Sequence, residues 1–189
     1  MKKLFGKLLG EAKPTLPPSE PIVIVSGLPR SGTSMMMKML EAGGIPPLTD
    51  KLRTADNDNP KGYYEFERVK QMDKGDTGWI PQAQGKVVKV ISALLKHLPA
   101  SYNYQVIFLR RHMSEILASQ RKMLIHRGED PDKMDDAQMA MLFENHVRQV
   151  EKWLGQQSNI EVLYVHYSDV MADPLTAINS MGRFLGRDL

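Results

Sequence analysis

The stretch that decides the fold is Ile22-Val-Ile-Val-Ser26, which runs directly into Gly27-Leu-Pro-Arg-Ser-Gly-Thr-Ser34. Four consecutive β-branched residues without polar alternation are typical of a strand buried on both faces of a parallel sheet. The glycine- and hydroxyl-rich turn leads into a methionine-rich stretch that ends near Gly43 and predicts a helix. This order of strand, tight loop and helix favours phosphate binding, because N–H groups point outward at a helix N-terminus.

Strands and helices continue to alternate along the rest of the chain. Apolar, β-branched runs predict three further strands, at 86–91, 106–109 and 162–165. Apolar residues at helical spacing predict two helices, at 113–125 and 140–154. Asp173 followed by Pro174 has the cap-then-proline order that starts a last helix. The alternation predicts a doubly wound α/β fold with a mainly parallel sheet.

Two parts of the chain do not follow this alternation. Four prolines between Pro14 and Pro21 form a stiff linker, so we expect a basic N-terminal arm with its linker at 1–20 and one globular domain at 21–189. Residues 45–85 are rich in Pro, Asn, Asp and Gly, which predicts irregular structure with one helix after Tyr64.

The loop after the first strand copies the spacing of the nucleotide-triphosphate P-loop, with one change. Thr33 stands where that motif has its phosphate-binding lysine, and a cation is present three residues earlier, as Arg30. The missing lysine disfavours a kinase or ATPase, which uses it to hold the β- and γ-phosphates. A turn without a ligand would not need glycine, arginine and hydroxyl residues packed at one junction.

A second candidate anion site follows the strand predicted at 106–109. Arg111 lies just beyond this strand, and Ser119 lies two turns into the next helix. Both would sit at the carboxyl edge of the sheet, where open α/β sheets bind ligands. An arginine with a hydroxyl suits a second phosphate, whereas Arg110 should point the other way. The alternative is a local ion pair between Arg111 and an acid such as Glu115.

Together these segments resemble the sulfotransferase family, with its bacterial, carbohydrate and tyrosylprotein branches. Pro29-Arg-Ser-Gly-Thr-Ser34 resembles the family's 5′-phosphosulfate loop, and Arg111 with Ser119 resembles its 3′-phosphate site. Asn59-Pro-Lys-Gly-Tyr-Tyr-Glu65 is similar to a segment of bacterial members. Tyr167-Ser-Asp-Val170, Asp173-Pro174 and Phe184-Leu-Gly186 resemble the family's closing run. The resemblance covers most of residues 21–186.

The resemblance implies a sulfuryl donor, 3′-phosphoadenylyl sulfate (PAPS), and in-line transfer to an acceptor hydroxyl or amine without a metal. Arg30 would act in catalysis, and the donor would be bound by Arg30, Ser31, Gly32, Thr33, Ser34, Arg111 and Ser119. An acid from residues 45–70 would take the acceptor proton; Glu65 is the first choice and Asp50 the second. Glu65 is also explained by a helix N-terminus, where an acid complements the dipole.

Two alternative functions stay open at this point. One is a P-loop kinase or another NTP-dependent phosphotransferase. The other is a non-catalytic nucleotide-binding module of the same fold, favoured because many family members carry a downstream Gly-rich loop that this sequence lacks before Leu189.

Composition narrows the remaining classes. With 189 residues, 42% of them hydrophobic, and a net charge of +3, the chain predicts a globular domain rather than a nucleic-acid binder. The absence of cysteine suits a reducing cytoplasm, and no segment predicts a signal peptide or a membrane span. The basic arm at 1–13 leaves weak membrane-surface contact open. The histidine spacing predicts no metal site, and Pro60 and Lys61 spoil a calcium-loop pattern at 56–67.

Overall fold

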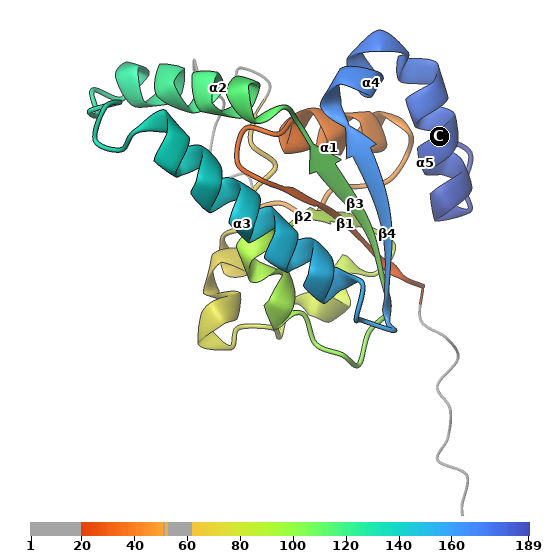
Figure 1. The fold of residues 1–189 in the computed structure, drawn as a ribbon. Helices are drawn as coiled ribbons and strands as arrows, with labels where there is room; N and C mark the ends of the chain where they lie inside the picture. The colour runs from red at the N-terminus through yellow and green to blue at the C-terminus, as the bar shows by residue number, and fades with distance from the viewer. Residues whose placement is uncertain (1–19, 51, 53–61) are drawn as a thin grey trace, which may run out of the picture.

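The computed structural model describes residues 20–50, 52 and 62–189, and its centre is a parallel sheet. Within the described residues the sheet has four strands in the order β2-β1-β3-β4, every neighbouring pair parallel (Figure 1). The strands are β1 (Ile22–Gly27), β2 (Val87–Lys89), β3 (Tyr104–Arg110) and β4 (Ile160–His166). The calcium-loop pattern and the basic arm fall largely or wholly outside the described residues.

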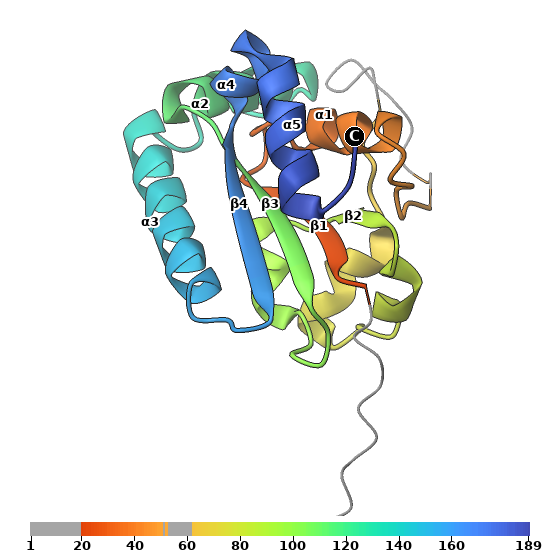
Figure 2. The same ribbon diagram turned by 90° about the vertical axis from the view of Figure 1, so that its right-hand side faces the viewer.

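Helices cover both faces of this sheet, as Figures 1 and 2 show. One face packs against α1 (Thr33–Ala42), α4 (Tyr167–Ala172) and α5 (Pro174–Leu185). The other packs against α3 (Asp136–Leu154) and three 3-10 helices, η1 (Glu67–Lys74), η2 (Ile80–Ala83) and η3 (Ser92–His97). Helix α2 (Met113–His126) follows β3, and the chain then turns back into α3. This arrangement confirms the predicted α/β class.

Strand β1 shows why the opening sequence is so uniformly apolar. Ile22 and Ile24 pack into the core on the α3 side, whereas Val23 and Val25 pack into the core on the α1 side. Successive side chains of a strand point to opposite faces, so a central strand covered on both sides favours apolar residues. Its one polar side chain, Ser26, is satisfied by donating to the Val90 carbonyl at 2.8 Å. All six residues of β1 are buried.

The predicted elements are confirmed, with shifts at their ends. β2 is shorter than the run 86–91, and α3 begins at Asp136 because the Asp135 side chain accepts hydrogen bonds from the N–H groups of Ala137 and Gln138. The helix predicted after Tyr64 is confirmed as η1, whereas η2 lies in a part of the 45–85 segment that was expected to be irregular. Buried Trp79 packs edge-on against Phe66 at 5.6 Å between ring centroids, and this apolar anchor stabilises η1 and η2.

The order of strands places a crevice beside β1. The chain passes from β1 through α1 to β2 on one side and later to β3 on the other, so the direction of winding reverses here. Gly27 pairs with Leu109, which brings the loop after β1 and Arg111 after β3 to the same edge. Ligands of open α/β sheets bind at such a reversal. None of the described helices is long and apolar enough to cross a membrane.

Candidate active site

The loop between β1 and α1 has a backbone conformation that its glycines make possible. Gly27 has φ +147°, and a Cβ there would lie 2.6 Å from the Ser31 Oγ and 2.7 Å from the Leu109 carbonyl oxygen. Gly32 has φ +100°, and a Cβ there would lie 2.7 Å from the ring of Tyr167. Only a residue without a side chain fits both places. The loop therefore packs closely against β3 and α4.

The loop delivers the N-terminus of α1 to the cavity. Gly32 is the N-cap of α1, and no side chain caps the first turn. The first N–H groups of a helix have no partner within it and carry the positive end of the helix dipole. Thr33 and Ser34 in this first turn both line a cavity of about 400 Å³. An anion in the cavity would meet this helix end directly.

Ser31 is turned away from that cavity. Arg30 has a left-handed backbone, φ +68°, which directs the following residue inward. The Ser31 side chain is fully buried, its N–H donates to the Leu28 carbonyl at 3.2 Å, and its Oγ has no hydrogen-bond partner among the described residues. The sequence predicted that Ser31 binds the sulfuryl donor. In the structure its side chain lies under the loop and outside the cavity lining, where it forms part of the turn.

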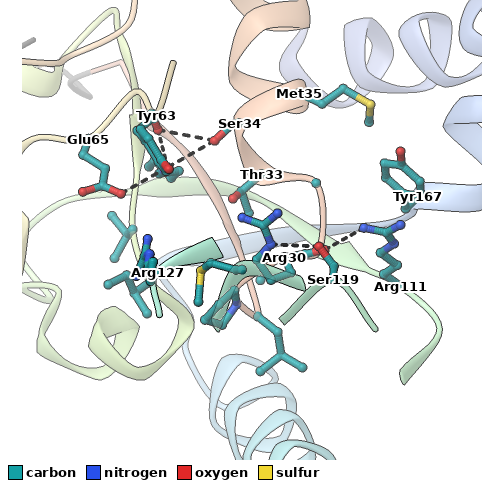
Figure 3. Close-up of a pocket in the computed structure, with 18 residues that line it drawn as sticks. Arg30, Thr33, Ser34, Met35, Tyr63, Glu65, Arg111, Ser119, Arg127 and Tyr167 are labelled. Carbon is teal, nitrogen blue, oxygen red and sulfur yellow. Dashed lines mark hydrogen bonds and ion pairs between the residues drawn. The ribbon is translucent and has the colours of Figure 1, made fainter. Parts of the chain in front are cut away.

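Three predicted residues, Arg30, Arg111 and Ser119, come together at the cavity (Figure 3). The Arg30 Nε donates to the Ser119 Oγ at 2.9 Å, and the Arg111 Nη1 donates to the Arg30 carbonyl at 3.0 Å. Arg111 and Ser119 lie 81 and 89 residues from Arg30 in the chain. The loop and the second candidate anion site thus form one connected cluster.

Both interpretations of Arg111 agree with its contacts. Its Nε donates to the Glu115 carboxylate at 2.8 Å, which is the local ion pair that the sequence left open. The guanidinium also lies over the Tyr167 ring, 4.3 Å from its centroid, and lines the cavity. Arg110 points elsewhere, as predicted: its Nε donates to Glu151 at 2.9 Å and its guanidinium covers Tyr164.

Glu65 lines the cavity near two lysines. Its side chain is 16% exposed, with Oε2 at 3.0 Å from the Lys70 Nζ and Oε1 at 3.9 Å from the Lys89 Nζ. The first helical residue of η1 is Glu67, so Glu67 rather than Glu65 occupies the first turn there. Asp50, the second choice, accepts from the Glu67 N–H at 2.6 Å and lies outside the cavity lining. Asp50 therefore holds the start of η1.

Lys89 is the most notable cavity residue that the sequence interpretation missed. It ends β2, and its Nζ donates to the Tyr63 carbonyl and to the Ser34 Oγ, the latter at 3.4 Å. A lysine inside the apolar run 86–91 was the available signal, since a charge in a buried strand needs a partner or a role. Tyr63, Met35 and Tyr167 also line the cavity without having been assigned a role.

The cavity is strongly basic. Among the residues that the structure describes, its charged lining consists of four cations and one carboxylate: Arg30, Lys89, Arg111, Arg127 and Glu65. With the N-terminus of α1, this lining suits a ligand that carries at least two anionic groups. Nowhere in residues 20–50, 52 and 62–189 do three or more acidic or histidine side chains group as metal ligands.

Comparisons with known proteins identify the fold independently. The model of the sulfotransferase domain family matches residues 20–189. One similar solved structure is a sulfotransferase domain from the Synechococcus PCC 7002 olefin synthase, with 16% identity and a TM-score of 0.54, covering 94% of this chain and 77% of that one. Another is a sulfotransferase from Alicyclobacillus acidocaldarius, with 14% identity and a TM-score of 0.53, covering 88% of this chain and 81% of that one. A third is a sulfotransferase domain from the curacin biosynthetic pathway, with 16% identity and a TM-score of 0.52, covering 89% of this chain and 75% of that one. No curated protein matches the sequence.

Proposed function

Because this chain belongs to the sulfotransferase domain family and is a sulfotransferase, we propose that its donor is PAPS and its acceptor a hydroxyl or amine. The observation that carries the proposal is the connected cluster of Arg30, Arg111 and Ser119 beside the uncapped start of α1. PAPS carries a phosphosulfate at one end of its ribose and a phosphate at the other. Two adjacent anion-binding elements suit such a molecule.

The phosphosulfate belongs at the β1–α1 loop in this proposal. The acceptor atom attacks sulfur, the bond from sulfur to the bridging oxygen breaks, and the electron pair stays on the 5′-phosphate. Negative charge therefore grows on the phosphate during transfer. The first N–H groups of α1, the Arg30 guanidinium and the Lys89 ammonium would stabilise that charge, since fixed donors are most effective where charge develops.

The 3′-phosphate belongs at Arg111 and Ser119. Ser119 accepts a hydrogen bond from Arg30 through its oxygen, so its own hydroxyl proton is available to donate to a phosphate. Arg111 uses two of its five N–H donors in the bonds to Glu115 and Arg30. Its stacking on Tyr167 fixes the plane of the guanidinium, and a fixed fork binds phosphate better than a mobile one.

Glu65 is the proposed base, and the acceptor is bound on its side of the cavity. Its contact with Lys70 orients the carboxylate, and Lys89 lies between it and Ser34 of the loop. A base must come within hydrogen-bond reach of the proton that it removes. Glu65 lies next to Lys89 and near the β1–α1 loop. It could therefore reach the proton of an acceptor that is aligned with the phosphosulfate.

The decisive experiment is a calorimetric titration of the full chain with 3′,5′-adenosine bisphosphate, the product nucleotide. We expect micromolar or tighter binding that survives EDTA, with 5′-AMP at least tenfold weaker because it lacks the 3′-phosphate. ATP with Mg²⁺ serves as the control for a phosphotransferase. Equal binding of AMP and the bisphosphate, or a strict requirement for Mg²⁺, would contradict the proposal.

The location of the protein is part of the same proposal. A chain with no cysteine needs no oxidising compartment, so we propose a cytoplasmic enzyme. Fractionation of the native cells with detection of the chain tests this. The predicted membrane-surface contact of the N-terminal arm lies outside the described residues and stays a prediction.

A further inference from the structure

A line of side chains along α2 continues outward from the donor cluster. Ser119, Met123 and Arg127 are spaced four residues apart, which places them on one face of the helix, and all three line the cavity. At 1.5 Å per residue, Arg127 lies about 12 Å beyond Ser119 along the helix axis. The cavity thus extends well past the residues proposed to hold the 3′-phosphate.

The cavity lining also includes apolar residues that follow β2. Val90 and Ile91 follow β2 and line the cavity, and Ile91 is 43% exposed although its side chain is large and aliphatic. Val90 is almost fully buried, so Ile91 and Met123 supply the accessible apolar surface of this lining. In Figure 3, Arg127 lies on the Glu65 side of Arg30, whereas Arg111 and Tyr167 lie on the other side. The lining on this side of the cavity therefore combines apolar side chains with a cation and a carboxylate.

We infer that Arg127 and Met123 select the acceptor, and that the acceptor is an amphiphile with an apolar body and an anionic group apart from its reacting hydroxyl or amine. This inference rests on the proposed function, which fixes the donor at the inner cluster. The reacting group would lie near Glu65, the apolar body against Ile91 and Met123, and the anion against Arg127.

The placement of Arg127 separates this role from two others. A basic residue after a helix C-terminus also offsets the helix dipole, and Arg127 has the position for that. A dipole role requires no contact with the cavity. A role in holding the donor would make Arg127 part of the phosphate cluster, and its removal would weaken the binding of 3′,5′-adenosine bisphosphate.

The test uses matched acceptors and the full chain. Sulfate transfer from labelled PAPS is measured to ω-hydroxy fatty acids of increasing length and to their methyl esters, which differ only in the anionic group. We expect the acid of the best length to exceed its ester about tenfold in kcat/KM. Arg127→Ala should bring the ratio close to one without changing the affinity for the bisphosphate, and Arg127→Lys should keep part of the preference.

Arg121→Ala is the matched control, because Arg121 lies on the same helix but pairs with Asp132 and does not line the cavity. It should leave the ratio unchanged. The inference is overturned if acid and ester react equally in the wild type, if neither reacts although the bisphosphate binds, if Arg127→Ala keeps the preference, or if it weakens bisphosphate binding about tenfold.

A separate measurement keeps the inference and the proposed function distinguishable. If the wild type fails to bind the bisphosphate, the proposed donor is wrong. Direct titration with 12-hydroxydodecanoate then decides the acceptor site alone. Weaker binding by Arg127→Ala than by the wild type supports the site, and equal or absent binding overturns it.

Discussion

The floor of the cavity and its α2 wall are built in opposite ways. The floor, residues 27–34, continues a fully buried strand and depends on two glycines with positive φ. The wall, residues 111–127, belongs largely to α2, whose residues are all described and of which only Ile116 is buried. The floor would bind a ligand through its backbone, so a substitution that disturbs binding there should also destabilise the fold. The wall would bind a ligand through its side chains, so replacing one of them should alter binding while the protein stays folded.

The largest effect is expected at Gly27. A methyl group there would clash with Ser31 and with the Leu109 carbonyl, and alanine rarely adopts φ +147°. We expect Gly27→Ala to lower the free energy of unfolding by about 3–5 kcal/mol and to abolish binding of the bisphosphate. Denaturant unfolding followed by circular dichroism measures the stability.

Gly44→Ala is the control that separates strain from clash. Gly44 has φ +87° with nothing within 4 Å of its missing Cβ, so only backbone strain is added. It should cost about 1–2 kcal/mol and leave nucleotide binding intact. Equal losses for the two variants would mean that the packing of the floor against β3 is unimportant.

Arg30 belongs to the floor by sequence, but its proposed role depends on its side chain. It therefore tests whether the floor and the wall differ in the way described. Its removal should lower kcat about 10²–10³-fold, as for one lost donor to a developing anion. Stability should change by less than about 1 kcal/mol, because alanine keeps the same backbone and no core packing is lost. Steady-state kinetics with saturating PAPS, together with thermal unfolding, gives both quantities.

Arg30→Lys is the matched variant, because lysine keeps the charge and loses the planar fork that reaches Ser119. Intermediate activity is expected. If Arg30→Ala unfolds the protein, or if it transfers sulfate at the wild-type rate, the catalytic role is refuted.

The next smaller effect is expected at Arg111, which belongs to the wall and can be compared with the adjacent Arg110. Arg111→Ala should weaken binding of the bisphosphate by about 2–4 kcal/mol and leave 5′-AMP almost unaffected. Arg110→Ala should leave both nucleotides unaffected, because Arg110 pairs with Glu151 away from the cavity. Calorimetry with both nucleotides decides, and equal losses of the two for Arg111→Ala would leave it only a structural role.

The smallest effect concerns pH and the contact between α3 and η3. Burial, with a smaller contribution from the charge of Lys96, lowers the pKa of His146, whose Nε2 lies 2.9 Å from the Ser92 Oγ. The folded state then binds fewer protons than the unfolded state, so stability should fall as pH drops through about 6.5. Between pH 7.5 and pH 5.5, the melting temperature of His146→Gln should fall less than that of the wild type. An identical loss would show that His146 does not titrate with unfolding.

The local order of residues was enough to predict the floor. The run Ile22–Val25 predicted a strand covered on both faces, and the glycine, arginine and hydroxyl pattern after it predicted a tight loop leading into a helix. That Arg111 and Ser119 line the same cavity also followed from local sequence, since both belong to one strand-and-helix unit. Such features depend on neighbours in sequence, and spacing encodes them directly.

The composition of the cavity was decided by tertiary structure. Spacing could not show that Lys89 from β2 reaches Ser34 and Tyr63, that Asp50 is engaged at the start of η1, or that Ser31 faces inward. It also could not show that Arg30 and Ser119, 89 residues apart, share a hydrogen bond. The parallel order β2-β1-β3 brings these segments to one edge of the sheet, and the pairing of distant strands is fixed only when the whole core packs.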